Sequence, residues 1–271
     1  MKKYFFTIVI FVISVLSTGC LELNTIVKVN KDGSGTVEET LLFSSEVVQM
    51  IKQFAESMPD SGSEKFSLMD EKQIKESAMK MGEGVKFVSA KPLKKSGREG
   101  YVATFSFKDI RKLKVDQSPD SKMPMNEGEP EEGEKKEIIT FDFQKGNTSK
   151  LTVNLPEKDF KTDEVNEEKK ETGTQDQNDF GDLEKAKQFL KDMRISIMMQ
   201  FDGTIENTDA TYVDGNKITL FDVNFGELLK HEDKLKLLKD KNPQSFEQAK
   251  EILKDIPGIK IELNKKVTVQ F

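Results

Sequence analysis

Short segments in which apolar and polar residues alternate run through most of this chain, and glycine-containing turns separate them. Lys31-Asp32-Gly33-Ser34-Gly35 separates two extended segments, and Asp214-Gly215-Asn216 separates another two. Alternation places apolar side chains on one face of a strand, and glycine supplies the positive φ that tight turns need. The pattern therefore predicts hairpins and further strands over 25–30, 36–44, 85–90, 101–107, 138–143, 151–155, 194–201, 210–213, 217–223, 259–263 and 267–271.

Apolar residues at helical spacing predict helices between these strands. Ser45 is positioned to cap a segment that carries Val47, Val48 and Ile51 on one face. Similar patterns predict helices over about 69–81, 182–193, 228–238 and 245–256. Strands and helices together predict an α+β fold, in which hairpins build an antiparallel sheet and several amphipathic helices cover it.

Two polar segments interrupt the pattern, near 116–136 and near 158–180. The first carries three prolines and a run of glutamates, and the second is equally charged and poor in apolar residues. Such composition cannot bury enough apolar surface to fold by itself. We expect both to be flexible parts of one domain that spans 20–271, the second as a surface loop or a domain linker.

The first nineteen residues have the pattern of a cleaved secretory signal. Lys2 and Lys3 precede an apolar stretch over 4–16, and small residues follow. As a helix this stretch reaches only about 20 Å, which is short for a hydrocarbon core of about 30 Å. Cys20, the one cysteine of the chain, comes directly after Gly19.

The segment Leu16-Ser17-Thr18-Gly19-Cys20 resembles the lipobox of bacterial lipoproteins, with Leu16 one place earlier than is usual. The resemblance implies cleavage between Gly19 and Cys20 and attachment of a diacylglyceryl group to the Cys20 sulfur. Two or more acyl chains make membrane anchoring stable. We expect a lipid-anchored protein on the extracytoplasmic side of the cell membrane. In an organism with two membranes we expect the outer one, because Leu21 rather than aspartate follows the cysteine.

A second resemblance rests on turn residues. Phe201-Asp202-Gly203, Asn207, Asp214-Gly215-Asn216, Ile218-Thr219-Leu220 and Phe225-Gly226 are similar to an arrangement in mycobacterial LppM-type lipoproteins. That family also has a cysteine, an extended segment and a glycine-containing hairpin, here Cys20-Leu21-Glu22-Leu23 leading to Asp32-Gly33-Ser34-Gly35. The resemblance implies an α+β, partly barrel-like envelope domain and carries no catalytic residue across.

Charge and cysteine content limit the function classes. The chain has a net charge of −6, and removing residues 1–19 with their two lysines makes it −8. Acids and bases are mixed, which argues against a nucleic-acid-binding protein. With one cysteine no intrachain disulfide forms, so stability rests on a buried apolar core.

The turn over 30–37 imitates part of a calcium-binding loop. Oxygen-bearing residues stand at the first, third and fifth places and Gly35 at the sixth, but Leu41 occupies the place of the bidentate glutamate. A plain hairpin turn is the preferred interpretation. His231, the one histidine, lies among charged residues and is expected on the surface, without a role in catalysis or zinc binding.

Adjacent acids such as Glu38-Glu39, Glu131-Glu132 and Glu167-Glu168 raise the possibility of carboxylate catalysis. Adjacent acids in a strand point to opposite faces, however, and the chain has no nucleophile elbow, P-loop or dinucleotide fingerprint. We predict a non-enzymatic envelope lipoprotein without catalytic, metal or cofactor-binding residues, which binds a partner protein or an apolar or lipid ligand. The alternatives are an envelope hydrolase and a structural or assembly protein without a ligand.

Overall fold

The structure is a computed structural model that describes residues 21–57, 67–117, 137–156, 190–191, 193–231 and 256–271, with the single positions 248, 252 and 254. The predicted signal peptide, Gly19 and Cys20, and nearly all of the polar segments near 116–136 and 158–180 lie outside these residues, as do most of the helices predicted over 182–193 and 245–256.

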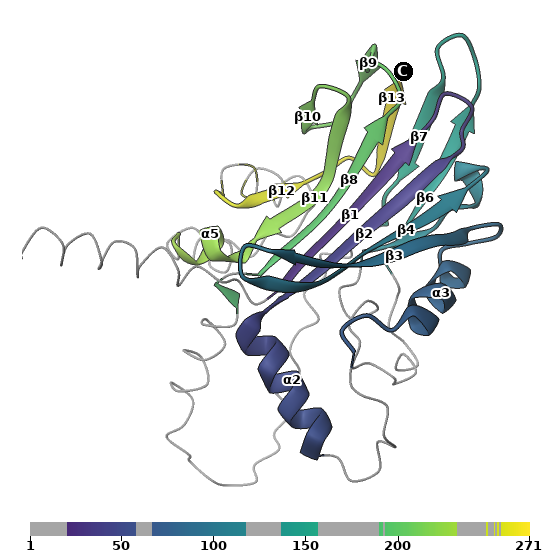
Figure 1. Cartoon of the computed structure of the whole chain (residues 1–271). Coiled ribbons are helices and arrows are strands. Elements are labelled where there is room, and N and C mark those ends of the chain that lie inside the picture. The colour runs from purple at the N-terminus through teal and green to yellow at the C-terminus, as the bar shows by residue number, and fades with distance from the viewer. Residues whose placement is uncertain are drawn as a thin grey trace, which may run out of the picture.

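The larger sheet consists of β1 (Leu21–Val29), β2 (Gly35–Ser44), β3 (Lys86–Lys95), β4 (Arg98–Phe107), β8 (Arg194–Phe201), β10 (Val213–Asp214), β11 (Lys217–Asn224) and β12 (Ile259–Ile261). Its order is β10-β11-β8-β1-β2-β4-β3, with β12 also paired to β11 (Figure 1). Neighbours are antiparallel except β1 and β8, which run parallel with Glu22 opposite Arg194.

The smaller sheet consists of β5 (Val115–Asp116), β6 (Ile138–Gln144), β7 (Lys150–Asn154), β9 (Asn207–Thr208) and β13 (Lys266–Gln270), in the order β5-β6-β7-β13-β9. The hairpins predicted around 31–35, 145–148 and 214–216 are confirmed as β1–β2, β6–β7 and β10–β11. Burial alternates along β1, with Leu21, Leu23, Thr25, Val27 and Val29 all buried. The strand predicted over 25–30 is present, but it begins earlier than predicted, at Leu21.

Side chains from both sheets form one main core. Val27 and Phe105 of the larger sheet belong to the same cluster as Leu151 and Val267 of the smaller one. The rings of Phe201 and Phe271 join the two layers, with centroids 4.6 Å apart. This face of the larger sheet, which carries the odd-numbered residues of β1 and β2, is called the inner face below.

Three α-helices are described: α2 (Ser45–Ser57), α3 (Glu71–Lys80) and α5 (Phe225–Leu229), with a 3-10 turn η1 (Ile110–Lys112). The helices predicted from Ser45 and over 69–81 are confirmed as α2 and α3. The predicted cap is wrong, because the hydroxyl of Ser44 rather than Ser45 accepts from the amide of Val47, at 3.3 Å. Asp70 caps α3 by accepting from the amides of Lys72 and Gln73 at 2.9 and 3.1 Å. α2 extends away from the end of the large sheet (Figure 1). No helix in the described part of the chain is both long and apolar enough to span a bilayer.

The predicted fold class is wrong in two respects. Among the described residues, those in strands far outnumber those in helices, so the protein is mainly a two-sheet structure rather than an α+β fold with several amphipathic helices. The sheets are also not closed into a partial barrel, because β3 and β10 form opposite edges of the larger sheet and do not pair in the described chain. Layering the two sheets buries their apolar faces without closure.

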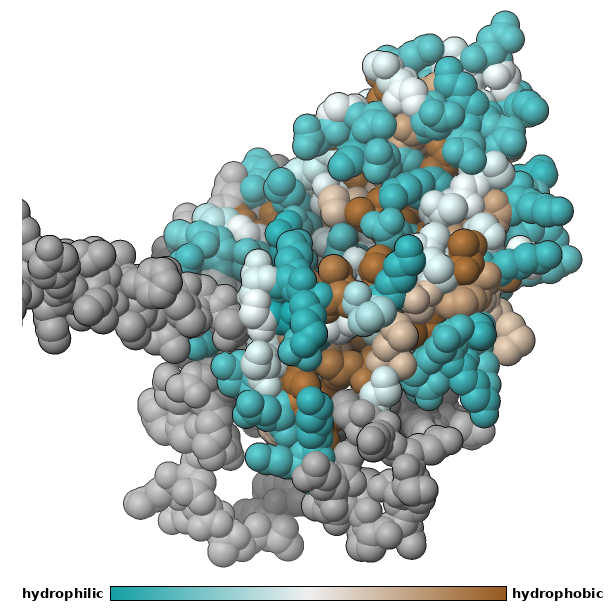
Figure 2. All heavy atoms as spheres, viewed as in Figure 1, coloured by the Kyte–Doolittle hydropathy of each residue, from teal (hydrophilic) through white to brown (hydrophobic). Residues whose placement is uncertain are grey.

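In Figure 2 hydrophilic side chains cover most of the visible face, and hydrophobic residues show among them near α3. Two exposed large apolar residues, Met79 at 75% and Val88 at 55%, belong to α3 and β3. The other two, Met50 and Val213, lie on α2 and β10. These four residues come from four different elements, and isolated exposed apolar residues are ordinary on protein surfaces.

Candidate functional site

The first residues of β1, which follow Cys20 in the sequence, lie at one end of the larger sheet. Leu21 is the first residue of β1 and lies opposite Phe43 of β2, which in turn lies opposite Glu99 of β4. On the other side of β1, Glu22 lies opposite Arg194, the first residue of β8. We call this region the Leu21 end. Because β1 begins here, whatever holds Cys20 also holds this end of the sheet.

The inner face of the Leu21 end is apolar and buried. Leu21 and Phe43 are 5% and 4% exposed, and α2 begins two residues after Phe43. The hydroxyl of Ser45 donates to the carbonyl of Gly97 at 3.1 Å and links α2 to the turn between β3 and β4. The cluster is separate from the main core and comprises Leu21, Leu23, Leu41, Phe43, Val47, Val48, Ile51 and Ile195. The start of β1 is therefore part of the folded body.

The outer face of the same end carries ion pairs. Glu22 pairs with Arg98, and the Nζ of Lys95 lies 3.9 Å from the Glu22 carboxylate. Arg194 donates from two guanidinium nitrogens to the two carboxylate oxygens of Asp222, both at 2.9 Å. These bonds to Asp222, and more weakly the charge of Glu22, raise the pKa of Arg194 above its usual value. These paired charges come from five strands, β1, β3, β4, β8 and β11.

Sequence reasoning missed this cluster, because the strands that it predicted over 85–90 and 101–107 left 91–100 as a loop between them. Instead β3 continues to Lys95 and β4 begins at Arg98, so only Ser96 and Gly97 form the turn, with φ of 51° and 75°. Lysine favours strands poorly, yet pairing with β4 extends β3 through Lys94 and Lys95. The Ser96-Gly97 pair was the signal for a tight hairpin.

A polar pair lies on the inner face beyond the end cluster. Glu39 of β2 lies opposite Thr25 of β1 and Ala103 of β4, and Tyr101 lies two residues along β4. Burial first, and then the negative charge of Glu39, raise the pKa of Tyr101. Tyr101 contacts both the main core and the end cluster, so its neutral phenol lies between the two apolar regions.

The predicted separation of the adjacent acids is confirmed for Glu38 and Glu39. Glu38 pairs with Lys28 at 3.0 Å on the outer face, whereas Glu39 belongs to the row of Val37 and Leu41 on the inner face. Glu131-Glu132 and Glu167-Glu168 lie outside the described residues. Two carboxyl groups on opposite faces of a strand cannot act together on one bond.

Glu262 is a buried carboxylate with a structural role. It is 5% exposed and accepts from the amide and hydroxyl of Thr211 at 2.6 and 3.0 Å. It also accepts from the amides of Leu263 and Asn264, each at 2.9 Å. Four donors saturate its oxygens, and the bonds to Thr211 tie the segment before β10 to the segment after β12. Sequence reasoning did not single it out.

In the turn that imitates a calcium loop, side-chain oxygens accept hydrogen bonds from other residues of the same turn. Asp32 accepts from the amide and hydroxyl of Ser34 at 2.9 and 2.6 Å, which lowers the pKa of Asp32. The side-chain amide of Asn30 donates to the Ser34 hydroxyl at 3.0 Å. The hairpin-turn interpretation is confirmed, and no group of three metal-ligating acids, histidines or cysteines occurs among the described residues.

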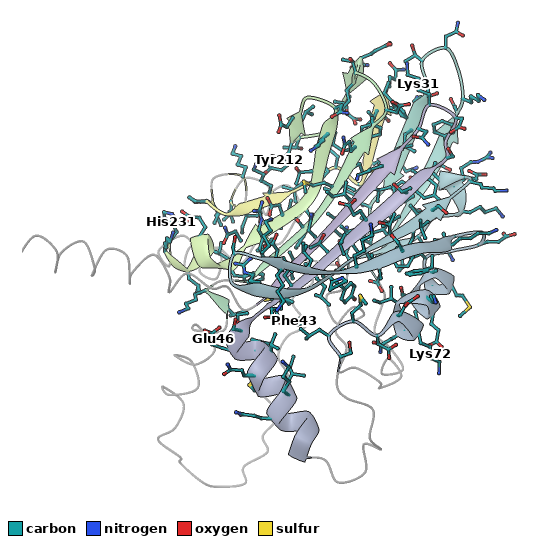
Figure 3. All side chains as sticks on the ribbon, viewed as in Figure 1. Lys31, Phe43, Glu46, Lys72, Tyr212 and His231 are labelled. Carbon is teal, nitrogen blue, oxygen red and sulfur yellow. The ribbon has the colours of Figure 1, made fainter. Side chains whose placement is uncertain are left out.

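His231 lies just after α5 on the surface, as predicted. Its Nε2 is 3.5 Å from the carboxylate of Glu227, and its side chain is 36% exposed. The carboxylate of Glu227 is also bonded to Lys230 at 2.9 Å. Figure 3 places His231 away from Lys31 and Tyr212. This arrangement is that of a surface ion cluster.

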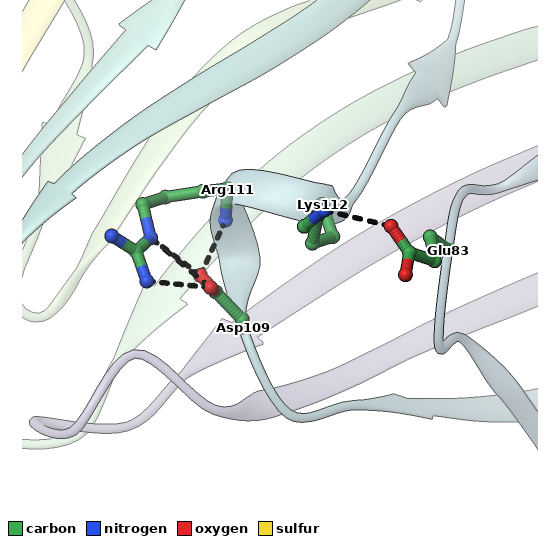
Figure 4. A network of polar contacts seen from close by, with 4 residues as sticks. All are labelled: Glu83, Asp109, Arg111 and Lys112. Carbon is green, nitrogen blue, oxygen red and sulfur yellow. Dashed lines mark hydrogen bonds and ion pairs between the residues drawn. The ribbon is translucent and has the colours of Figure 1, made fainter.

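Another surface network lies beside η1 (Figure 4). Asp109 accepts from the backbone amide of Arg111 at 3.0 Å and from its guanidinium at 2.7 to 3.1 Å. These bonds lower the pKa of Asp109. Lys112 donates to Glu83 at 2.7 Å and lowers the pKa of that carboxyl. The first pair caps η1 locally, and the pair with Glu83 joins η1 to the turn that follows α3.

Comparisons with known proteins add one structural neighbour. No family model matches the chain, and no curated protein matches it. Among solved structures it is similar to the folded domain of LppM from Mycobacterium tuberculosis, determined by NMR. The TM-score is 0.28 at 9% identity, over 74% of this chain and 81% of that chain. A likeness this low carries no argument about function, which rests on the residues described above.

Proposed function

We propose that this chain is a lipid-anchored protein of the cell envelope that acts by binding. Cys20 carries the anchor on the extracytoplasmic side of the membrane, the outer one where there are two. The observation that carries the proposal is the burial of Leu21, the residue directly after Cys20, at 5% exposure in β1. With no flexible tether between them, acylation of Cys20 fixes the Leu21 end of the sheet at the bilayer.

The described carboxylates support binding over hydrolysis. Glu262 is saturated by backbone and hydroxyl donors, and Glu22 and Asp222 face arginine side chains. A carboxylate fully engaged in this way is a poor general acid or base, because catalysis needs a proton to exchange with substrate. We therefore prefer the non-enzymatic function to the envelope hydrolase.

The edge of the larger sheet supports binding over self-assembly. β3 forms this edge and carries Pro92 together with Lys91, Lys94 and Lys95, all of them exposed. Lysine and proline on an edge strand oppose pairing with a second sheet. Held end-on at the bilayer, the protein meets lipids and other envelope proteins, and these are the partner classes that we propose.

Replacing the cysteine tests the anchor. Cells expressing Cys20→Ser are grown with an alkyne-tagged fatty acid and then fractionated, with Ser14→Ala in the apolar stretch before the lipobox as the control. We expect Cys20→Ser to take up no fatty acid and to leave the acylated membrane fraction, because no other thiol exists in the chain. Fatty-acid labelling of Cys20→Ser equal to that of Ser14→Ala would show that the anchor lies elsewhere.

A further inference from the structure

The turn between β3 and β4 is strongly basic in an acidic protein. Residues 91–98 contain four cations and no acid, although the chain as a whole has a net charge of −6. The cations are Lys91, Lys94, Lys95 and Arg98. We call these residues the basic tip. A local charge of this kind, opposite in sign to the whole protein, is suited to contact with an anionic surface.

The basic tip lies level with the start of β1. Leu21 is opposite Phe43, Phe43 is opposite Glu99, and Glu99 is opposite Lys94. Three strand spacings separate Leu21 from Lys94, a distance of about 14 Å along the sheet. Figure 1 shows the β3–β4 hairpin turning close to the start of α2, where the Ser45 hydroxyl donates to the Gly97 carbonyl. The tip is thus at the same end of the sheet as Leu21, the residue that follows Cys20 in the sequence.

The lysines of the tip have weak partners. The Lys94 side chain is 76% exposed and pairs with Glu99 at 2.9 Å, and Lys95 is 63% exposed at 3.9 Å from Glu22. Glu22 is shared with Arg98, so Glu22 and Glu99 together face three of the cations. Exposed ion pairs of this kind contribute little and exchange readily for another anion.

We propose that the basic tip docks on anionic phospholipid headgroups of the bilayer that holds Cys20. This inference rests on the proposed function for the anchor. The bilayer is the partner because it is the anionic surface within reach of a tip located beside the acylated residue. Acyl chains and the tip form two contacts at separate points, which sets the sheet at a defined angle to the membrane instead of leaving it to pivot.

Lysine accessibility in vesicles tests the proposal on the full lipidated protein. The protein is reconstituted in vesicles of phosphatidylcholine alone, or with about one third phosphatidylglycerol, and labelled with an amine-reactive acetylating reagent. Peptide mass spectrometry then gives the labelling rate of each lysine. We expect Lys94 and Lys95 to react about five-fold more slowly in the anionic vesicles, and molar salt to abolish the difference.

Lysines elsewhere in the fold are the internal controls. Lys31, exposed in the turn after β1, lies at the far end of the sheet from Phe43 and Glu46, and Lys72 is exposed on α3 (Figure 3). Both should react equally in the two vesicle types. The variant Lys95→Glu should lose most of the protection of Lys94, whereas Lys72→Glu should leave it unchanged.

The outcomes separate the two proposals. Equal labelling of Lys94 and Lys95 in both vesicle types, with a lipid on Cys20, overturns the docking of the tip and leaves the anchor intact. Protection that depends on phosphatidylglycerol, with Cys20 unmodified, supports the tip and overturns the anchor. Protection that appears only when other membrane proteins are present identifies a protein partner in place of lipid and overturns the inference.

Discussion

Leu21 lies opposite Phe43 at the end of the larger sheet, and both side chains are buried in the cluster that α2 completes. The fold therefore begins one residue after Cys20. This relationship joins the predicted anchor to the structure, because it leaves no length of chain in which the domain could move away from the membrane.

Truncating Leu21 tests whether β1 starts where the structure places it. Leu21→Ala should lower the free energy of unfolding by about 2–4 kcal/mol, because the side chain is buried among apolar residues. Val213→Ala, at a position 47% exposed, is the control and should change it by less than about 0.5 kcal/mol. Chemical denaturation measures both. Equal effects would mean that Leu21 belongs to a mobile tether.

The contact between Phe201 and Phe271 joins the two sheets, and a double-mutant cycle measures it. Phe271 is 1% exposed and follows the last strand, β13. Phe271→Ala should lower the free energy of unfolding by about 3–5 kcal/mol. In a double-mutant cycle of Phe201→Leu and Phe271→Leu, the coupling energy between the two rings should be about 0.5–1.5 kcal/mol. Additive single effects would show that the sheets do not meet at this ring pair.

Removing the charge of Glu262 should destabilise the protein although the shape is retained. In Glu262→Gln one oxygen becomes an amide that faces the amides of Thr211 or of Leu263 and Asn264, so donor meets donor. We expect the free energy of unfolding to fall by about 1–3 kcal/mol. Glu206→Gln, whose carboxylate is exposed and accepts from Thr148 at 3.0 Å, should be nearly neutral. Thermal melts that do not distinguish the two variants would contradict this role.

Tyr101 should make stability fall at high pH. Its pKa is raised in the folded state, so the folded protein retains the phenol proton where the unfolded chain loses it. The stabilisation is complete below the unfolded pKa of about 10 and declines as the pH rises above it. Unfolding curves of wild type and Tyr101→Phe at several pH values measure this. The advantage of wild type over the variant should shrink above about pH 10, and a constant difference would be inconsistent with burial of the phenol.

Local turn chemistry explains which parts of the fold were predictable. Asp32-Gly33 and Gly215-Asn216 supply positive φ at Gly33 and Gly215, and both hairpins form where the sequence predicts them. The strand over 194–201 also matches β8, because Ile195, Ile197 and Met199 stand at every second position and a glycine turn follows. These features depend only on neighbours in sequence.

Long-range pairing explains what the sequence could not show. β1 pairs in parallel with β8 through Glu22 and Arg194, which are far apart in the chain and carry no local signal for each other. The same limit hid Arg98 and Lys95 beside Glu22, since the basic segment has the composition of a loop. The α+β prediction gave the helices the same importance as the strands. In the described residues the strands dominate, because long-range pairing joins them into two extended sheets.

The anchor on Cys20 is the central claim, and intact mass spectrometry of the protein extracted from its own membrane tests it most directly. The proposal predicts a chain that begins at Cys20 and carries the mass of a diacylglyceryl group, with or without a further acyl chain on the new amino terminus. A chain that retains residues 1–19, or one that begins at Cys20 with a free thiol, would contradict it.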